Sequence, residues 1–129
     1  MAPLVLLLHA DPLTQLLVGS GLQGYGYEVL FAGTTDEAQD LLQSRRIGVL
    51  VADMDADVTS RLAFVRSARK LDPSLTVIYT ARLPSKLPDR DKVPGAPCLC
   101  SPYHPHQLVS LLGQLTRRSS IDEDEAHAA

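Results

Sequence analysis

The chain has no tryptophan, only two cysteines and few aromatic residues among its 129 positions. The core must therefore be built mainly from Leu, Val, Ile and Ala. Cys98 and Cys100 are too few for a disulfide framework, and a metal site would need more ligands than these two supply. Because they alternate along an expected strand, we expect both thiols on one face, buried as packing groups.

Long apolar runs and basic clusters are also missing. No run approaches the roughly 20 residues that cross a bilayer, and the start of the chain lacks the basic segment of a signal peptide, so we expect a cytoplasmic protein. The net charge is −3, but four of the fifteen acids lie at 122–125, which leaves eleven acids against twelve bases in positions 1–121. No basic face indicates nucleic-acid binding.

Five short apolar runs predict five β-strands. They are Leu4–Leu8, Val29–Ala32, Ile47–Ala52, Leu75–Tyr79 and Ala96–Cys100. Helix-like stretches alternate with them, which predicts an α/β domain with a doubly wound five-stranded parallel sheet in the flavodoxin-like order 2-1-3-4-5. We expect this domain over residues 1–118. Residues 119–129 lack a periodic apolar face and are expected to be an acidic, disordered tail that solvates the chain or, less favoured, binds a partner.

Capping residues and prolines predict where the helices begin and end. Asp11 before Pro12 is typical of a helix start, and Leu13, Leu16 and Leu17 follow at helical spacing. Thr34 and Glu37 match a capping box. A third helix is expected from about residue 60 to 71, and a last one after His104-Pro105. The four prolines between positions 82 and 97 leave room for only one or two helical turns.

Four of the apolar runs end in a polar residue. These residues are His9, Asp53, Thr80 and Ser101. In a parallel sheet the carboxyl ends of the strands meet at one edge, where open α/β sheets place their sites. The four side chains are therefore expected at the same edge.

The order and spacing of several segments resemble the receiver domain of bacterial response regulators. The segments are LLLHADPLTQLL, YEVLFAGTTDEAQDLL, IGVLVADMD, LTVIYTA and CSP, and the resemblance covers about residues 3–116. It implies that Asp53 is the phospho-acceptor position and Thr80 the switch hydroxyl. It also implies that Pro102 is the proline after the family's lysine, usually joined by a cis peptide bond.

The chain departs from the family at the residues that perform the chemistry. The resemblance implies an acidic pair where the chain has His9 and Ala10, a lysine at Ser101, and an aromatic switch residue at Cys98. In the family, Mg²⁺ is held by the acidic pair, by the phospho-acceptor and by the backbone carbonyl two residues after it. Asp55 stands at that last position here. Phosphoryl transfer needs cations to screen the charge of the transition state, and here both cationic elements are altered.

Each candidate residue has a second interpretation. Asp53 is either a surviving phospho-acceptor or, as we favour, an aspartate bonded to loop amides and to Ser101 or Thr80. Asp11, Asp53 and Asp55 are weak metal candidates, and Asp11 is better explained as a helix cap. His9 could act as an acid, a base or a zinc ligand, but we favour a solvent-facing or aspartate-paired histidine. Without a bound cation, these carboxylates should repel, so we expect Asp53→Ala to be tolerated.

We therefore interpret the chain as a single-domain atypical receiver that signals by protein–protein contact, without normal aspartyl phosphorylation, enzymatic activity or a cofactor. The partner would be a histidine kinase or another signalling protein, or a second copy of the chain. The family's contact surface is the fourth helix, fifth strand and fifth helix, which the proline-rich segment has rebuilt. The alternative is a working phospho-acceptor in a two-component phosphorelay, using Mg²⁺ and phosphorylated at Asp53. A flavodoxin-like cofactor binder is the weakest reading, because the turn after the first strand has no phosphate cradle.

Overall fold

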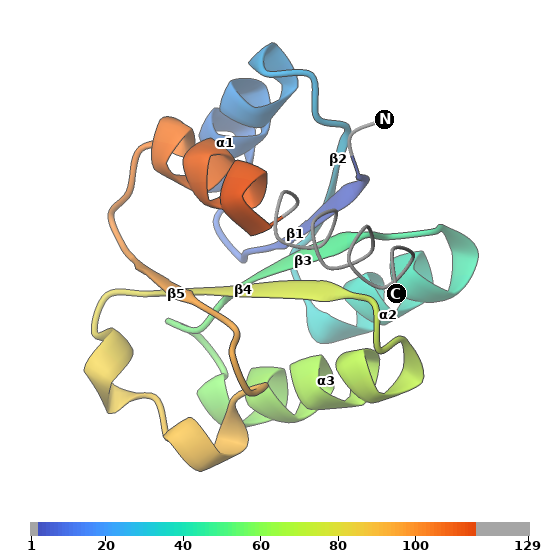
Figure 1. Cartoon of the computed structure of the whole chain (residues 1–129), viewed down its shortest axis with the longest axis vertical. Helices are drawn as coiled ribbons and strands as arrows, with labels where there is room; N and C mark the ends of the chain where they lie inside the picture. Colours follow the sequence, from blue (N-terminus) through green and yellow to red (C-terminus); the bar gives the residue numbers. More distant parts are fainter. Residues whose placement is uncertain (1–2, 116–129) are drawn as a thin grey trace, which may run out of the picture.

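The computed structural model describes residues 3–115, which form one five-stranded parallel sheet in the order β2-β1-β3-β4-β5 (Figure 1). The strands are β1 (Val5–Leu8), β2 (Val29–Ala32), β3 (Val49–Asp53), β4 (Thr76–Ala81) and β5 (Cys98–Cys100). The predicted fold class and strand order are confirmed, and strand ends differ from the sequence expectation by at most two residues. The expected tail at 119–129 and the domain end at residue 118 lie outside the described residues.

Four helices flank the sheet within the described part of the chain. They are α1 (Pro12–Gly24), α2 (Thr35–Ser44), α3 (Val58–Leu71) and a last helix over residues 105–115. Both predicted caps are present. Asp11 accepts a hydrogen bond from the main-chain nitrogen of Leu13 (3.3 Å), and Thr34 accepts one from that of Glu37 (3.2 Å). These side chains satisfy main-chain donors that a helix start leaves unpaired.

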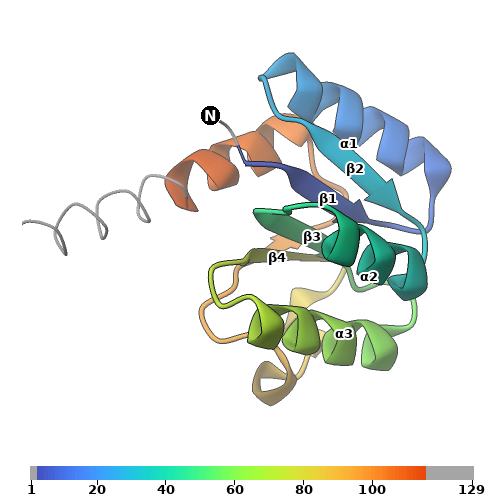
Figure 2. The same cartoon turned by 90° about the vertical axis from the view of Figure 1, so that its right-hand side faces the viewer.

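The helices form two layers, one on each face of the sheet. Helix α1 and the helix over 105–115 cover one face, while α2 and α3 cover the other (Figure 2). The central strand β1 shows why a strand with helices on both faces must be a continuous apolar run. Its Val5 and Leu7 belong to one core, its Leu6 and Leu8 to the other, and all four are fully buried. A strand covered on both faces has no position left for polar side chains.

Helix α1 presents the three leucines of its predicted stripe to solvent rather than to the core. Its buried residues are Val18, Gly19 and Leu22. The exposed fractions of Leu13, Leu16 and Leu17 are 63%, 64% and 60%. Their spacing thus predicted the helix correctly but marks its outer face. Gly19 explains the close approach on the inner side, because a Cβ there would lie only 2.7 Å from Cε1 of the Phe31 ring on β2.

Between β4 and β5 the described chain forms two single-turn 3₁₀ helices, η1 (Pro84–Lys86) and η2 (Asp89–Asp91), and no fourth α-helix. This confirms the expectation that the prolines leave room for only single helical turns between these strands. The segment is anchored from inside. Leu87 and Val93 are buried in the core, and the main-chain nitrogen of Val93 donates to the hydroxyl of the fully buried Tyr79 (2.9 Å).

The expectation of two buried thiols is wrong for Cys100, which is exposed, while Cys98 is half-buried. The reason is that β5 is an edge strand of only three residues, so its end is uncovered. Burial raises the pKa of the Cys98 thiol above its ordinary value. Within residues 3–115, no helix is both long and apolar enough to cross a membrane.

Candidate functional site

The polar residues that follow the strands meet at the carboxyl edge of the sheet, as predicted. Asp53 is the last residue of β3 and pairs in register with Thr80 of β4. His9 directly follows β1 and Ser101 directly follows β5. Thr80 lies one residue before the end of β4 rather than after it. His9, Asp53 and Thr80 come into contact, whereas the main-chain nitrogen of Ser101 donates to the carbonyl oxygen of Ala81 (2.8 Å) and Ser101 makes no bond to Asp53 among the described residues.

The carboxylate of Asp53 is buried and has partners on both oxygens. Thr80 Oγ1 donates to Oδ1 (3.2 Å), and His9 Nε2 lies 3.8 Å from the same oxygen. The other oxygen, Oδ2, lies 3.5 Å from Nη1 of Arg61. The expected bond to Thr80 is confirmed, as is the pairing of His9 with an aspartate. Of the two alternatives, Ser101 or Thr80, the partner is Thr80, and the expected bonds to loop amides are absent from the contacts of residues 3–115.

Arg61, which the sequence analysis did not single out, is the charged partner inside this site. It comes from the first turns of α3 and is only 2% exposed. Its Nη1 donates to the main-chain carbonyl oxygen of Asp53 (2.7 Å), and its Nη2 lies 3.5 Å from the carbonyl oxygen of Gly33 after β2. The guanidinium therefore joins the ends of two strands to α3. A buried arginine needs such partners, because its charge cannot be removed by deprotonation.

The orientation of His9 follows from its neighbours. The main-chain nitrogen of Asp11 donates to His9 Nδ1 (3.0 Å), so Nδ1 is an acceptor and the ring proton of neutral His9 sits on Nε2. Nε2 is the atom that faces Asp53. The separation of 3.8 Å is too long for a hydrogen bond, so the interaction is electrostatic. His9 thus presents a donor to the carboxylate, not a free lone pair to a metal.

Burial dominates the electrostatics of Asp53. It raises the pKa of the carboxyl above the ordinary value of 3.8, and the nearby charge of Asp55 raises it further. His9, the Thr80 hydrogen bond and Arg61 oppose this shift without cancelling it. The carboxylate therefore gains less from its partners than it loses by leaving water. The site is a desolvated pair rather than an open, charged cleft.

The three carboxylates expected to form one repelling group do not do so. Asp11 is exposed, and its side chain is taken up by the cap of α1, where Thr14 Oγ1 donates to Oδ2 over 2.7 Å. This hydrogen bond lowers the pKa of Asp11. Asp55 is also exposed and accepts from the main-chain nitrogen of Arg82 (3.0 Å). The like-charge premise behind the tolerance of Asp53→Ala thus holds for Asp55, whose charge raises the pKa of Asp53, and not for Asp11. Asp53 also faces Arg61 and His9, which oppose that repulsion.

A Mg²⁺ ion does not fit the residues at this edge. Mg²⁺ requires oxygen ligands in near-octahedral geometry, and Ala10, at the family's ligand position, supplies none. His9 offers a nitrogen whose proton faces the carboxylate, and a guanidinium already lies against Asp53. In the part of the chain that the structure describes, no group of three His, Cys, Asp or Glu side chains could hold a metal ion.

The turn after β5 places a second unpredicted residue near the site. The Ser101–Pro102 peptide bond is cis, as the resemblance implied. Tyr103 follows, and its hydroxyl is buried without a hydrogen-bond partner among the described residues. Burial, with a smaller contribution from the charge of Asp53, raises the pKa of Tyr103 to about 12. The phenol thus lies within the electrostatic reach of Asp53 and remains neutral.

Comparison with known proteins identifies the fold but no close sequence relative. No family model matches the chain, and no curated protein matches it. Among solved structures, the chain is similar to the chemotaxis protein CheY4 of Vibrio cholerae, at 23% identity and a TM-score of 0.79 over 88% of this chain and 98% of that one. It is also similar to a response regulator receiver protein of Sinorhizobium medicae, at 24% identity and a TM-score of 0.78 over 88% and 94%.

A third similar structure is the receiver domain of the response regulator PhyR from Erythrobacter litoralis, at 20% identity and a TM-score of 0.75 over 88% of both chains. The class is thereby defined: the chain has the fold of response regulator receiver domains, with the strand order 2-1-3-4-5. Within that fold, the carboxyl edge of its sheet carries His9 and Ala10 after β1, Asp53 at the end of β3 and Ser101 after β5.

Proposed function

We propose that the chain is a receiver-type signalling module of the cytoplasm that acts by binding another protein, without aspartyl phosphorylation, a cofactor or enzymatic activity. The observation that carries the proposal is the environment of Asp53. An internal guanidinium, Arg61, lies against the carboxylate, and the positions that would hold a metal and a lysine are Ala10 and Ser101. A donor phosphate would approach this carboxylate without a mobile cation to screen the developing charge.

Action by contact is supported by the surface of α1. Residues 12–24 contain no charged side chain, and the exposed Leu13, Leu16 and Leu17 form one stripe on the outer face of the helix. Apolar groups gathered on an exposed helix commonly mark a protein interaction site. The partner would be a signalling protein such as a histidine kinase, or a second copy of the chain.

A second candidate function is phospho-acceptance at Asp53 within a phosphorelay. The hydroxyl of Thr80 favours it, because Oγ1 already lies 3.2 Å from Oδ1 of the acceptor. The two candidates are separated by treating the full chain with acetyl phosphate and Mg²⁺ and measuring its intact mass. We expect an unmodified mass at all donor concentrations. A phosphoryl adduct on the wild type that is absent from Asp53→Asn would overturn the proposal in favour of phospho-acceptance.

A further inference from the structure

Exposed apolar side chains gather on one side of the molecule. Seven large apolar side chains are exposed within residues 3–115, and five of them come from α1, its C-cap and β2. They are Leu13, Leu16, Leu17, Tyr25 and Phe31. The Phe31 ring lies against Gly19 of α1, so β2 adds to the same patch. The patch is thus centred on α1.

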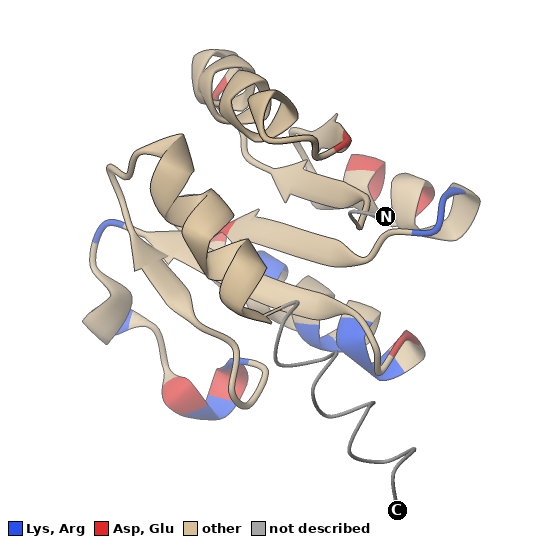
Figure 3. Ribbon diagram, turned by 45° about the horizontal axis from the view of Figure 1, so that its top comes forward, with Lys and Arg blue, Asp and Glu red and all other residues tan. Residues whose placement is uncertain are grey.

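The two helices of this layer contain no charged residue. Neither α1 nor the helix over 105–115 has a Lys, Arg, Asp or Glu. Figure 3 shows the helix over 105–115 without a coloured segment, whereas blue segments lie along α3. In a two-fold symmetric dimer, a residue near the axis faces its own copy, so a charged residue there is repelled. Two copies can bring this layer together without such repulsion.

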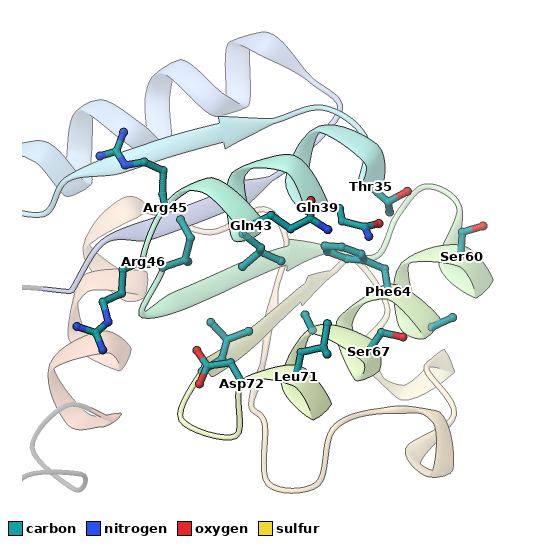
Figure 4. A pocket seen from close by; sticks show the side chains of 15 residues that line it. Thr35, Gln39, Gln43, Arg45, Arg46, Ser60, Phe64, Ser67, Leu71 and Asp72 are labelled. Atoms are coloured by element: carbon teal, nitrogen blue, oxygen red, sulfur yellow. The ribbon is translucent and has the colours of Figure 1, made fainter.

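The opposite helical layer is charged and provides the contrast. It carries a groove of about 690 Å³ between α2 and α3, and Arg45, Arg46 and Asp72 are among the residues that line it (Figure 4). Leu71 also lines this groove and is 88% exposed. A second copy bound here would bring arginines toward arginines. The charge distribution therefore favours the α1 layer for self-association.

The outer stripe of α1 is large at one end and small at the other. Leu13, Leu17, Ser20 and Gly24 follow one another at intervals of four, three and four residues, so they share one face of the helix. Ser20 and Gly24 are exposed, and nothing lies within 4 Å of the position that a Cβ would take on Gly24. The second half of the stripe therefore leaves room for a side chain from outside.

The spacing of the stripe matches an antiparallel copy of itself. The pair Leu13 and Gly24 and the pair Leu17 and Ser20 have the same midpoint, between residues 18 and 19. A two-fold axis at that midpoint places each leucine over a small residue of the other copy. Facing positions that alternate large and small side chains let packed helices interdigitate. A parallel copy would instead set leucine against leucine.

The layer is also large enough for a stable contact. Ten of the 13 residues of α1 and nine of the residues 105–115 are exposed or half-buried. Gly21 of α1 lies against Pro105, so the two helices are neighbours in the layer. A standard protein–protein interface uses about 20–30 residues on each side. With Phe31 beside them, the two helices reach the lower end of that range.

We propose that α1 pairs antiparallel with α1 of a second copy of the chain, around a two-fold axis between residues 18 and 19. Leu13 packs over Gly24 of the second copy and Leu17 over its Ser20, while the helix over 105–115 flanks the contact. This inference rests on the proposed function, in which α1 is the binding surface, and it names the partner.

Analytical ultracentrifugation of the full chain measures the pairing. We expect the average mass to approach twice the 14.0 kDa of the chain at about 200 µM and to fall toward 14.0 kDa at about 2 µM, as a Kd of about 10 µM requires. Raising the salt concentration to about 0.5 M should change this Kd by less than about twofold, because the paired helices carry no charge to screen. A mass of 14.0 kDa at the higher protein concentration would overturn the proposal.

Two matched substitutions locate the contact. Leu17→Glu puts a charge near the axis, opposite its own copy, and should leave the chain monomeric at about 200 µM. Leu71→Glu makes the same change at an exposed leucine of the other helical layer and should leave the Kd unchanged. Both leucines are exposed, so both variants should keep the fold, which circular dichroism checks. Equal effects of the two variants would overturn α1 as the contact.

Ser20→Leu separates the antiparallel pairing from unspecific apolar association. The variant adds apolar surface, so an unspecific contact would become tighter. In the antiparallel pair the added side chain meets Leu17 of the second copy, and overpacking should raise the Kd by at least about tenfold. Tighter association of Ser20→Leu than of the wild type would therefore overturn the proposed pairing.

Failure of this inference is distinguishable from failure of the proposed function. A monomeric chain that acetyl phosphate leaves unmodified would overturn the dimer and keep the proposed function, with a different protein as the partner of α1. A chain that pairs as described but takes a phosphoryl group on Asp53 would support the dimer and overturn the proposed function.

Discussion

A single nitrogen of Arg61, Nη1, contacts both the main-chain carbonyl oxygen (2.7 Å) and the carboxylate Oδ2 (3.5 Å) of Asp53. The two side chains are only 3% and 4% exposed. Such a pair loses hydration on both sides, so its net contribution to stability is small, yet each charge depends on the other. The raised pKa of Asp53 and its contact with Arg61 are therefore compatible. The raised pKa reflects the cost of burying the Asp53 carboxylate. The contact explains why removing either residue alone leaves the other buried without its partner.

We expect this mutual dependence to appear in a double-mutant cycle. Arg61→Met leaves a buried carboxylate without its cation and should cost about 3–5 kcal/mol of unfolding free energy. Asp53→Asn leaves a buried guanidinium without a counter-charge but also removes a charge that burial disfavours, so its cost should be smaller. The double variant should be more stable than the sum of the singles predicts, by about 1–3 kcal/mol. Urea unfolding of the four proteins measures this. Additive losses would show that the pair is not coupled. An Asp53→Asn variant more stable than the wild type would show that repulsion between the carboxylates outweighs the contact with Arg61.

The stability of the protein should also depend on the ionisation of Asp53. Its pKa is raised above 3.8 in the folded state, so the folded chain binds more protons than the unfolded chain above that pH. The unfolding free energy of the wild type relative to Asp53→Asn should therefore be highest below pH 3.8 and fall as the pH rises through the folded pKa. Urea midpoints of both proteins across this range provide the measurement. A difference that grows with pH would mean that Arg61 and His9 outweigh burial.

Two buried phenols give a matched pair of substitutions. Tyr79→Phe removes the acceptor of the main-chain nitrogen of Val93 and should cost about 1–3 kcal/mol, because that donor is buried. Tyr103→Phe removes a hydroxyl that has no partner within residues 3–115 and should be neutral or stabilising by up to about 1 kcal/mol. Thermal or urea unfolding distinguishes them. Equal losses in the two variants would contradict the hydrogen bonding described here.

Restoring a metal site should require more than the two family residues. From the sequence, Ala10→Asp with Ser101→Lys is expected to bind Mg²⁺, since Asp53, the Asp55 carbonyl and Thr80 remain in place. In the structure, Nη1 of Arg61 already lies 3.5 Å from Oδ2 of Asp53, so we expect weak binding in the double variant and about tenfold tighter binding when Arg61→Met is added. Isothermal titration with Mg²⁺ measures each variant, and Ser101→Lys alone serves as the control that should not bind. Equal affinities with and without Arg61 would refute its role as the competing cation.

The strand order and the helix starts were predictable because they depend on local patterns. A continuous apolar run such as β1 is needed wherever a strand is covered twice, and Asp11 and Thr34 cap helices through bonds within three residues of themselves. Periodicity was less informative about which face of a helix meets the sheet. Leu13, Leu16 and Leu17 of α1 recur at helical spacing, but Val18, Gly19 and Leu22 meet the sheet, so the predicted stripe faces outward.

Arg61 lies within a helix, so the rule that polar residues after parallel strands share one edge does not point to it. A signal was nevertheless present, since Arg61 lies four residues before Val65 and seven before Ala68 on the buried stripe of α3. A charged residue within an apolar stripe indicates a buried partner, and Asp53 was the available acid. The partner of Tyr79 was not predictable in this way. Its bond to Val93 depends on the path of a segment with no regular periodicity.

The bond between Tyr79 and Val93 has a consequence for how information could pass through this chain. Thr80 contacts Asp53, while the preceding ring is held in the core and fixes the 82–97 segment from within. The position of that segment is thus set by core packing and by the bond from Arg82 to Asp55, without a direct bond to Asp53 among the described residues. A protein that binds this segment meets a surface held by the core, and its bound fraction follows mass action in the amounts of the two proteins.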